Sequence, residues 1–270
     1  MRRVKTFISL VGEEFRLHFA FKRRYFFSTI TTFVSNLIIM GGIILVSIPS
    51  TSYGYDVQAV LQKSNATRLI GFLYFFLGMS SLGLPEGAVS TARQLGTIDN
   101  LALSPLGLTG VIGAKFLPSY VGCLVETLIA VILLSLAFGL RVMWSFGPIV
   151  LNSVIAALGM LGLGYVLGGL TIRFKQLGLV KNLLFVLLFA LGIMPMGYDS
   201  AEGLSRFAQF FPFTQGLIRT RHALLPESAG TISIPLWLFM GCSAALLCLG
   251  VLVFRRFERQ SLRQGTLGSY

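Results

Sequence analysis

Charged side chains are scarce in this sequence, because Asp, Glu, Lys and Arg together make up only 12% of its 270 residues. Soluble domains carry about 25% charged residues, so this chain has too few to cover a surface that faces water. Apolar residues account for 54%, and the 30 glycines raise that share to about 65%, whereas soluble domains reach about 45 to 50% on the same count. The composition excludes a soluble enzyme and a disordered chain, and it indicates a membrane protein.

Acidic residues are scarcer still, with 10 Asp and Glu against 22 Lys and Arg and a formal net charge of +12. In a soluble protein such an excess suggests nucleic-acid binding. In a chain this apolar it indicates contact with anionic lipid head groups. We therefore expect the lipid bilayer as a partner and no nucleic acid.

Residues of the kinds that form catalytic, metal or nucleotide sites are few and poorly placed. Cys123, Cys242 and Cys248 fall in apolar stretches, which favours small apolar side chains over disulfide or metal ligation. His18 and His222 lie far apart, with no carboxylate or cysteine at the spacing of a metal site. The chain has no Gly-x-x-x-x-Gly-Lys-Ser/Thr loop to hold a nucleotide's phosphates. We expect no catalytic residue, metal or cofactor in this chain.

Long apolar stretches are what the chain has instead. A membrane-crossing helix needs about 20 apolar residues, and six stretches approach or exceed that length. They are Phe26 to Ile48, Leu69 to Leu84, Phe116 to Leu140, Phe146 to Ile172, Asn182 to Met196 and Ile234 to Phe254. We predict an all-α fold, a polytopic membrane protein with six transmembrane helices in a single domain over residues 1–270.

The distribution of lysine and arginine gives the orientation of these spans, because cytoplasmic loops are enriched in both residues. With a cytoplasmic N-terminus, 16 of the 22 fall in cytoplasmic segments and the other six fall outside. We therefore place both termini in the cytoplasm, including a basic tail at residues 255–270.

Residues 1–25 precede the first span and have a helical repeat of their own. Apolar side chains recur there at three- and four-residue steps: Val4, Phe7, Ile8, Val11, Phe15 and Phe19. This pattern predicts an amphipathic helix that lies in the membrane interface. A simple anchor and a docking surface for a cytoplasmic partner are both open.

Residues 86–105, between the second and third spans, predict a short helix just beneath the membrane. Thr97 is placed to cap it, and Ile98, Leu101 and Ala102 share one face. Pro105 ends it, because the residue before a proline avoids the helical region. Such an apolar stripe suits docking into a groove of another protein.

Three stretches resemble the ABC-2 type transporter permeases, the membrane subunits of one class of ATP-binding-cassette exporters. The first is the loop Arg93-x-x-Gly96-Thr97-Ile98-Asp99-x-Leu101-x-x-Ser104-Pro105. The second is residues 207–219, with Pro-x-Thr followed by an arginine, and the third is the basic run Arg255-Arg256-Phe257-Glu258-Arg259. The similarity covers essentially the whole chain, including its amphipathic start.

The resemblance implies a function and partners. It implies a permease subunit that moves a lipophilic or amphiphilic compound, such as a drug or lipid, out of the cytoplasm or inner leaflet of a bacterial or archaeal cell membrane. A separate ATPase subunit would bind ATP and Mg²⁺, and a second permease copy or a paralogue would complete the membrane part. The short helix after Gly96 would be the coupling helix, which moves with the ATPase as a rigid lever.

The resemblance assigns ATPase coupling to Glu86, Arg93, Gly96, Thr97, Asp99, Leu101, Ser104 and Pro105. Many members have a glutamate directly before the arginine, whereas this chain has Ala92 there and Glu86 is the nearest upstream acid. The run from Gly96 to Asp99 favours the branch that handles drugs and lipids. The branch that exports polysaccharides or glycolipids is the alternative.

Four residues are candidates for the substrate path, namely Asn36, Glu126, Phe211 and Phe213. A charge deep in a span, such as Glu126, costs about 2.5 to 3.5 kcal/mol on insertion scales, so we expect it to be protonated, paired or turned into the bundle. A purely structural hydrogen bond is an equal alternative for Glu126 and Asn36. The two phenylalanines belong to residues 197–232, which we expect to re-enter the outer leaflet under cover of protein, where the family has its outer gate.

Glycines crowd the fourth predicted span. They are Gly159, Gly162, Gly164, Gly168 and Gly169. Small residues let helices approach closely, and we favour packing within the subunit over pairing between subunits.

Other functions predict features that differ from these. An ion-coupled secondary transporter acting without an ATPase predicts inverted repeats and several intramembrane charges, but the sequence shows no visible repeat and one deep acid. An intramembrane enzyme needs paired aspartates, a Ser/His pair or metal ligands inside the spans, which the predicted spans lack. A scaffold or sensor without transport is also open.

Overall fold

The computed structural model describes residues 2–46, 55–140, 142, 144–174, 177–193, 211–225 and 234–264. Within these ranges every regular element is a helix, which confirms the predicted all-α class. The helices are α1 (Arg2–Arg24), α2 (Phe26–Val46), α3 (Tyr55–Gln94), α4 (Ile98–Ala102), α5 (Gly107–Ala137), α6 (Phe146–Phe174), α7 (Gly178–Ile193), α9 (Pro212–Leu224) and α10 (Leu236–Gln264).

Five of these helices, α2, α3, α5, α6 and α10, are long and apolar enough to cross a membrane. The fifth predicted span corresponds to α7, a shorter apolar helix of 16 residues, and its last predicted residues, 194–196, lie outside the described residues. A sixth crossing therefore stays a prediction. Of the predicted re-entrant segment, only residues 211–225 are described, and they contain α9.

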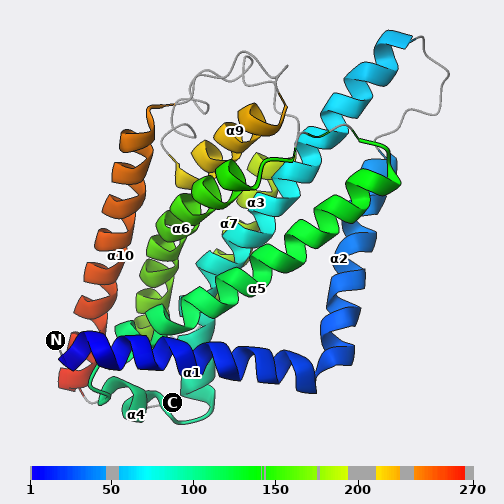
Figure 1. Ribbon diagram of the computed structural model, residues 1–270. Coiled ribbons are helices and arrows are strands. Elements are labelled where there is room, and N and C mark those ends of the chain that lie inside the picture. Colours follow the sequence, from blue (N-terminus) through cyan, green and yellow to red (C-terminus); the bar gives the residue numbers. More distant parts are fainter. Residues whose placement is uncertain are drawn as a thin grey trace.

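Helix α1 lies crosswise at the end of the bundle where α4 is also found, whereas α9 lies at the opposite end (Figure 1). Its apolar residues Ile8, Phe19 and Phe21 remain exposed, as expected of a helix that rests on a membrane surface. Its inner side packs against α5, where Gly122 leaves room for the side chains of His18 and Lys22.

The centre of the bundle is α6, which packs between α3 and α10, and glycine makes this packing possible. A Cβ atom added at Gly164 would lie 2.6 Å from the carbonyl oxygen of Leu82 in α3. One added at Gly162 would overlap the backbone of Leu246 in α10, and Gly169 lies against Phe254 of α10. The glycines of α6 thus serve packing within the subunit, as favoured from the sequence. We call α3, α6 and α10 the central group.

Helix α3 is longer than its apolar stretch predicts, because it continues through Pro85 to Gln94. Proline normally interrupts a helix through its ring and its missing N–H. Here Gly164 and Gly168 of α6 lie against Pro85 and make room for it. Residues 86–94, taken from the sequence as the start of the coupling loop, are therefore the last turns of α3.

Candidate functional site

The turn from α3 into α4 is built by Gly96. Its φ angle is +65°, its N–H donates to the carbonyl of Arg93 at 3.0 Å, and the next N–H, of Thr97, donates to the carbonyl of Ala92 at 2.8 Å. This pair of bonds is the Schellman arrangement that ends helices with a glycine in the left-handed region. The Gly-Thr pair of the loop is thus a helix stop that sets the direction of α4.

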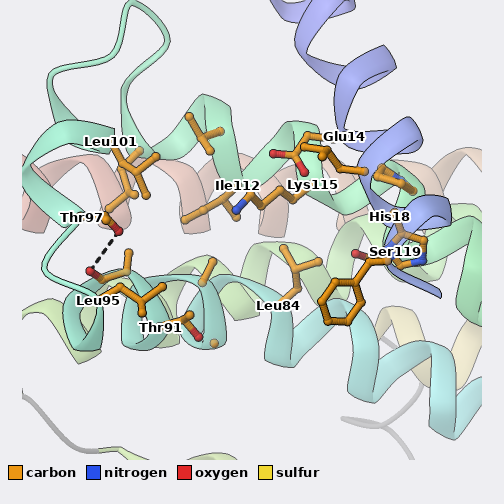
Figure 2. Close-up of a pocket in the computed structure, with 18 of the residues that line it drawn as sticks. Glu14, His18, Leu84, Thr91, Leu95, Thr97, Leu101, Ile112, Lys115 and Ser119 are labelled. Carbon is orange, nitrogen blue, oxygen red and sulfur yellow. Dashed lines mark hydrogen bonds between the residues drawn. The ribbon is translucent and has the colours of Figure 1, made fainter. Parts of the chain in front are cut away.

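Thr97 precedes α4 but does not cap it with its side chain. Its ψ angle is 0°, whereas a capping side chain needs an extended backbone at that position. The hydroxyl instead donates to the carbonyl of Ala92 at 3.3 Å (Figure 2). The predicted capping role of Thr97 is therefore wrong, and the residue reinforces the end of α3.

Helix α4 turns its apolar stripe toward its own subunit. Ile98 is 1% exposed, and Leu101 and Ala102 are half-buried. Ile98 therefore does not point outward for docking, because it packs against its own subunit; docking by the half-buried Leu101 and Ala102 stays a prediction. The apolar side chains that do point outward flank the helix, with Leu95 at 70% and Leu103 at 80% exposed.

Asp99, Asn100 and Pro105 are exposed around these two leucines, and Ser104 is half-buried. The sequence carried a signal for Leu95 and Leu103, since both are large apolar residues in a polar loop and neither belongs to the helical stripe. Together, Leu95, Asp99, Asn100 and Leu103 form the exposed tip of the molecule at this end, which we call the α4 tip.

Arg93 fixes the end of α3 to the end of α6. Its guanidinium donates to the carbonyl oxygens of Thr171 at 2.9 Å and Ile172 at 2.7 Å. These carbonyls belong to the last turn of α6, where helix carbonyls lack partners within the helix and a positive charge is favoured by the helix dipole. Arg93 thus ties the residues just before α4 to the end of α6.

Glu258 fixes the other side of α4 in the same way. Its carboxylate accepts from the backbone N–H of Leu108 at 3.0 Å and from the hydroxyl of Thr109 at 3.2 Å. Both residues lie in the first turn of α5, where free N–H groups and the dipole favour an anion. Glu258 is 8% exposed and belongs to α10. The sequence analysis missed this role, although an acid within a basic tail was a signal.

Glu86 lies inside α3 rather than in the loop, and it is 6% exposed. Its carboxylate accepts from the ammonium of Lys181 in α7 at 2.7 Å. The contact ties α7 to α3 two turns before Arg93. Three charged contacts, from Arg93, Glu86 and Glu258, thus hold the helix ends around α4 together.

Within the bundle, Glu126 is paired, which is one of the three outcomes expected for it. Its carboxylate accepts from the ammonium of Lys22 at 2.5 Å, and the two side chains are 42% and 27% exposed. Asn36 lines the same cavity of about 40 Å³ as Glu126, together with residues of α2, α3 and α5. The structure thus brings together these two of the four predicted path residues. Beside them, burial lowers the pKa of His18, Lys22 lowers it further and Glu126 opposes both.

Phe211 and Phe213 lie elsewhere, at α9. Phe213 is 1% exposed and packs edge-on against Tyr74, with ring centroids 6.3 Å apart. Phe211 is half-buried beside it. Arg221 of the same helix donates to the carbonyl of Gly192 at 2.7 Å, in the last turn of α7. This end of the bundle therefore has a packed interior, and Phe213 belongs to it.

Among the described residues, no group of three or more His, Cys, Asp or Glu side chains is placed to hold a metal ion.

A family model described as ABC-2 type transporter matches residues 6–225. The match begins in α1 and runs past the end of α9, so it includes the α4 tip and the turns on either side of it. No curated protein matches the chain.

Proposed function

The chain belongs to the ABC-2 type transporter family, and from this we propose that it is the permease of an ATP-binding-cassette exporter for a lipophilic or amphiphilic compound. Membership makes it a multi-pass membrane protein and a transport subunit that is not itself catalytic. Permeases of this family act with ATPase subunits, and ATP binds to the ATPase. The direction of transport, the substrate class and the arrangement of subunits are the proposal.

The α4 tip is the proposed contact with the ATPase. The observation that carries this assignment is the way α4 is held: Arg93 bonds the preceding turn to α6, and Glu258 bonds the following helix to α10. A short helix fixed on both sides moves with the helices that fix it, as a lever must. Leu95 and Leu103, exposed beside Asp99, supply the apolar contacts that a partner's groove buries.

A second permease copy is proposed against the face formed by α2 and α5. Glu126 is 42% exposed there in the single subunit, although a charged group in contact with lipid is costly. Cover by a second copy, or a water-filled route between two copies, removes this cost. We place the substrate route along Asn36 and Glu126, and we leave Phe213 out of it because its ring is buried within one subunit.

We place the α4 end of the bundle, with both termini, in the cytoplasm of a bacterial or archaeal cell. The basic side chains gathered at that end support this orientation: Lys22, Arg23 and Arg24 end α1, Arg173 ends α6, and Arg263 ends α10.

The experiment is co-purification with the cognate ATP-binding-cassette ATPase subunit, using Leu95→Asp and Leu103→Asp separately and together. We expect the double variant to lose most of the bound ATPase while it still elutes as a folded membrane protein. Leu236→Asp is the matched control, because Leu236 is exposed at the far end of α10, away from both the α4 tip and the face formed by α2 and α5. Full ATPase binding by the double variant would refute the α4 tip as the contact.

A further inference from the structure

A cavity of about 660 Å³ lies between α1, α3, α4 and α5, at the end of the bundle that carries the α4 tip. Figure 2 shows its lining, with Glu14 from α1, Leu84 from α3, Leu101 from α4 and Lys115 from α5. Ligand sites in proteins commonly occupy about 300 to 1,000 Å³. The volume therefore suits a small molecule or a large part of a lipid.

Most of the cavity wall is apolar, and the apolar lining continues to the surface. Leu108 and Ile112 form the inner wall and are each 1% exposed. Leu17, Phe21 and Leu95 also line the cavity, and they are exposed. Leu17 and Phe21 belong to α1, whose amphipathic pattern is that of a helix at the level of the lipid head groups. An apolar opening at that level admits a hydrocarbon chain from the membrane.

Two opposite charges face this cavity without an ion pair. Glu14 on α1 and Lys115 on α5 both line it, whereas the ion pairs among the described residues are Lys22 with Glu126 and Lys181 with Glu86. Both residues are half-buried, and a carboxylate and an ammonium beside apolar walls gain from partners of opposite charge, because partial loss of water contact weakens their solvation. Ser119, one helical turn from Lys115, adds a hydroxyl to the same wall.

We propose that this cavity binds one phospholipid of the adjacent leaflet whose zwitterionic head group carries a primary amine. The lipid phosphate contacts Lys115 and Ser119, its ammonium contacts Glu14, and an acyl chain runs along the apolar wall and leaves past Leu17 and Phe21. An anionic lipid without an amine leaves Glu14 unpaired, and a quaternary amine has no N–H to donate to that carboxylate. The site requires neither the ATPase nor the proposed export.

The test is native mass spectrometry of the purified full-length chain, titrated with phosphatidylethanolamine, phosphatidylglycerol and phosphatidylcholine. We expect tightest binding of one phosphatidylethanolamine, weakened about tenfold by Glu14→Gln and by Lys115→Gln, since each removes a hydrogen bond to a charged group. The affinity for phosphatidylglycerol should fall in Lys115→Gln and stay unchanged in Glu14→Gln. Glu13→Gln and Lys5→Gln are matched controls on exposed positions of α1, where binding should not change.

Gly87→Leu tests the cavity itself. Gly87 lines it, and a Cβ atom there would meet nothing within 4 Å. Leucine is a better helix former than glycine, so this variant should keep its melting temperature in lipid-free detergent. Its affinity for phosphatidylethanolamine should fall about tenfold or more, because the leucine side chain fills the space that the lipid needs.

Three results would overturn the proposal. These are unchanged lipid binding by Gly87→Leu, losses in Glu14→Gln and Lys115→Gln no larger than in their controls, and equal binding of the three lipids. A fourth result would refute it as well: if Gly87→Leu changed ATPase association and left lipid binding intact, the cavity would belong to the ATPase contact. Leu95 also lines the cavity, whereas Leu103 does not. Lipid binding is measured without the ATPase, and Leu103→Asp tests the ATPase contact without changing the cavity lining, so the two proposals fail separately.

Discussion

Helices α2 and α6 are both apolar enough to cross a membrane, but their own subunit covers them very differently. In α6, 67% of the residues in the most apolar stretch are buried, against 17% in α2. Glycines of α6 let α3 and α10 approach its backbone, whereas a Cβ atom at Gly42 of α2 would meet nothing. Helix α6 is thus covered within one subunit by α3 and α10, and α2 is left for lipid or for another chain to cover.

The charged contacts also differ between the helices around α4 and the helices α1 and α2. Around α4, three charged side chains join the ends of α3, α5, α6, α7 and α10, namely Arg93, Glu86 and Glu258. Helix α1 is joined to this assembly by the pair of Lys22 with Glu126, which is partly exposed. The difference teaches that α4 is tied to the central group through Arg93 and Glu258, while α1 and α2 contact the rest of the subunit chiefly through α5. Substitutions on the two sides of this division should therefore differ in effect.

The largest effect should come from Gly162→Leu in the central group. A side chain there overlaps the backbone of Leu246 in α10, and overlap with backbone cannot be relieved by a rotamer change. We expect a loss of about 3 kcal/mol or more, enough to prevent folding. The measurement is the yield of monodisperse protein in size-exclusion chromatography. Gly42→Leu in α2 is the control and should leave the yield unchanged. An equal loss of yield in both variants would contradict the difference in packing between α6 and α2.

Glu258→Ala should have the next largest effect. It removes a charged acceptor from two donors in the first turn of α5, which should cost about 1.5 to 3 kcal/mol. A lowered melting temperature, together with a loss of substrate-stimulated ATP hydrolysis, would agree with a cap that also positions α4. Glu13→Ala, at an exposed position of α1, should change neither quantity. An unaltered melting temperature in Glu258→Ala would show that the cap is dispensable.

Arg93→Gln should cost less stability and still separate ATPase binding from transport. The change weakens the contacts to Thr171 and Ile172, and we expect about 1 kcal/mol with ATPase binding retained and transport strongly reduced. Lysine at this position keeps the charge near the end of α6, so Arg93→Lys should recover part of the transport. Wild-type transport by Arg93→Gln in reconstituted vesicles would contradict the role of this contact.

The smallest effect should come from the pair of Lys22 and Glu126. A double-mutant cycle with Lys22→Gln and Glu126→Gln should give a coupling below about 1 kcal/mol, because partly exposed ion pairs are screened. Transport measured in the same variants decides between the two interpretations of Glu126. Native export by Glu126→Gln would leave it a structural contact and would remove it from the proposed route.

Much of the fold could be predicted because apolar runs of spanning length have few other structures available to them. The end of α3 could not, since Pro85 predicts a break and only the glycines of α6, about 80 residues away, show how the ring is accommodated. The direction in which the apolar side chains of α4 point could not be predicted for a similar reason. Its apolar stripe is visible in the sequence, but whether a stripe faces its own subunit or a partner depends on contacts between distant segments.

The loop that forms the candidate site could be predicted from the sequence, but the contacts that hold this loop against the neighbouring helices could not. Gly96 and Arg93 were named from the sequence, while their roles as a helix stop and as a contact to α6 required the structure. Glu258 was overlooked because its partners, Leu108 and Thr109, lie about 150 residues earlier in the chain. Local sequence patterns do not indicate contacts between residues so far apart in the chain.

The most direct test of the account measures distances between spin labels in the complete complex with its ATPase, with the native cysteines replaced by alanine. One label replaces Asn100 in α4, and the second replaces either Phe174 at the end of α6 or Phe27 in α2, all of which are exposed. On addition of ATP and Mg²⁺, the distance from residue 100 to residue 174 should stay constant, and the distance from residue 100 to residue 27 should change. A shift between residues 100 and 174 as large as that between residues 100 and 27 would contradict the claim that α4 moves with the central group.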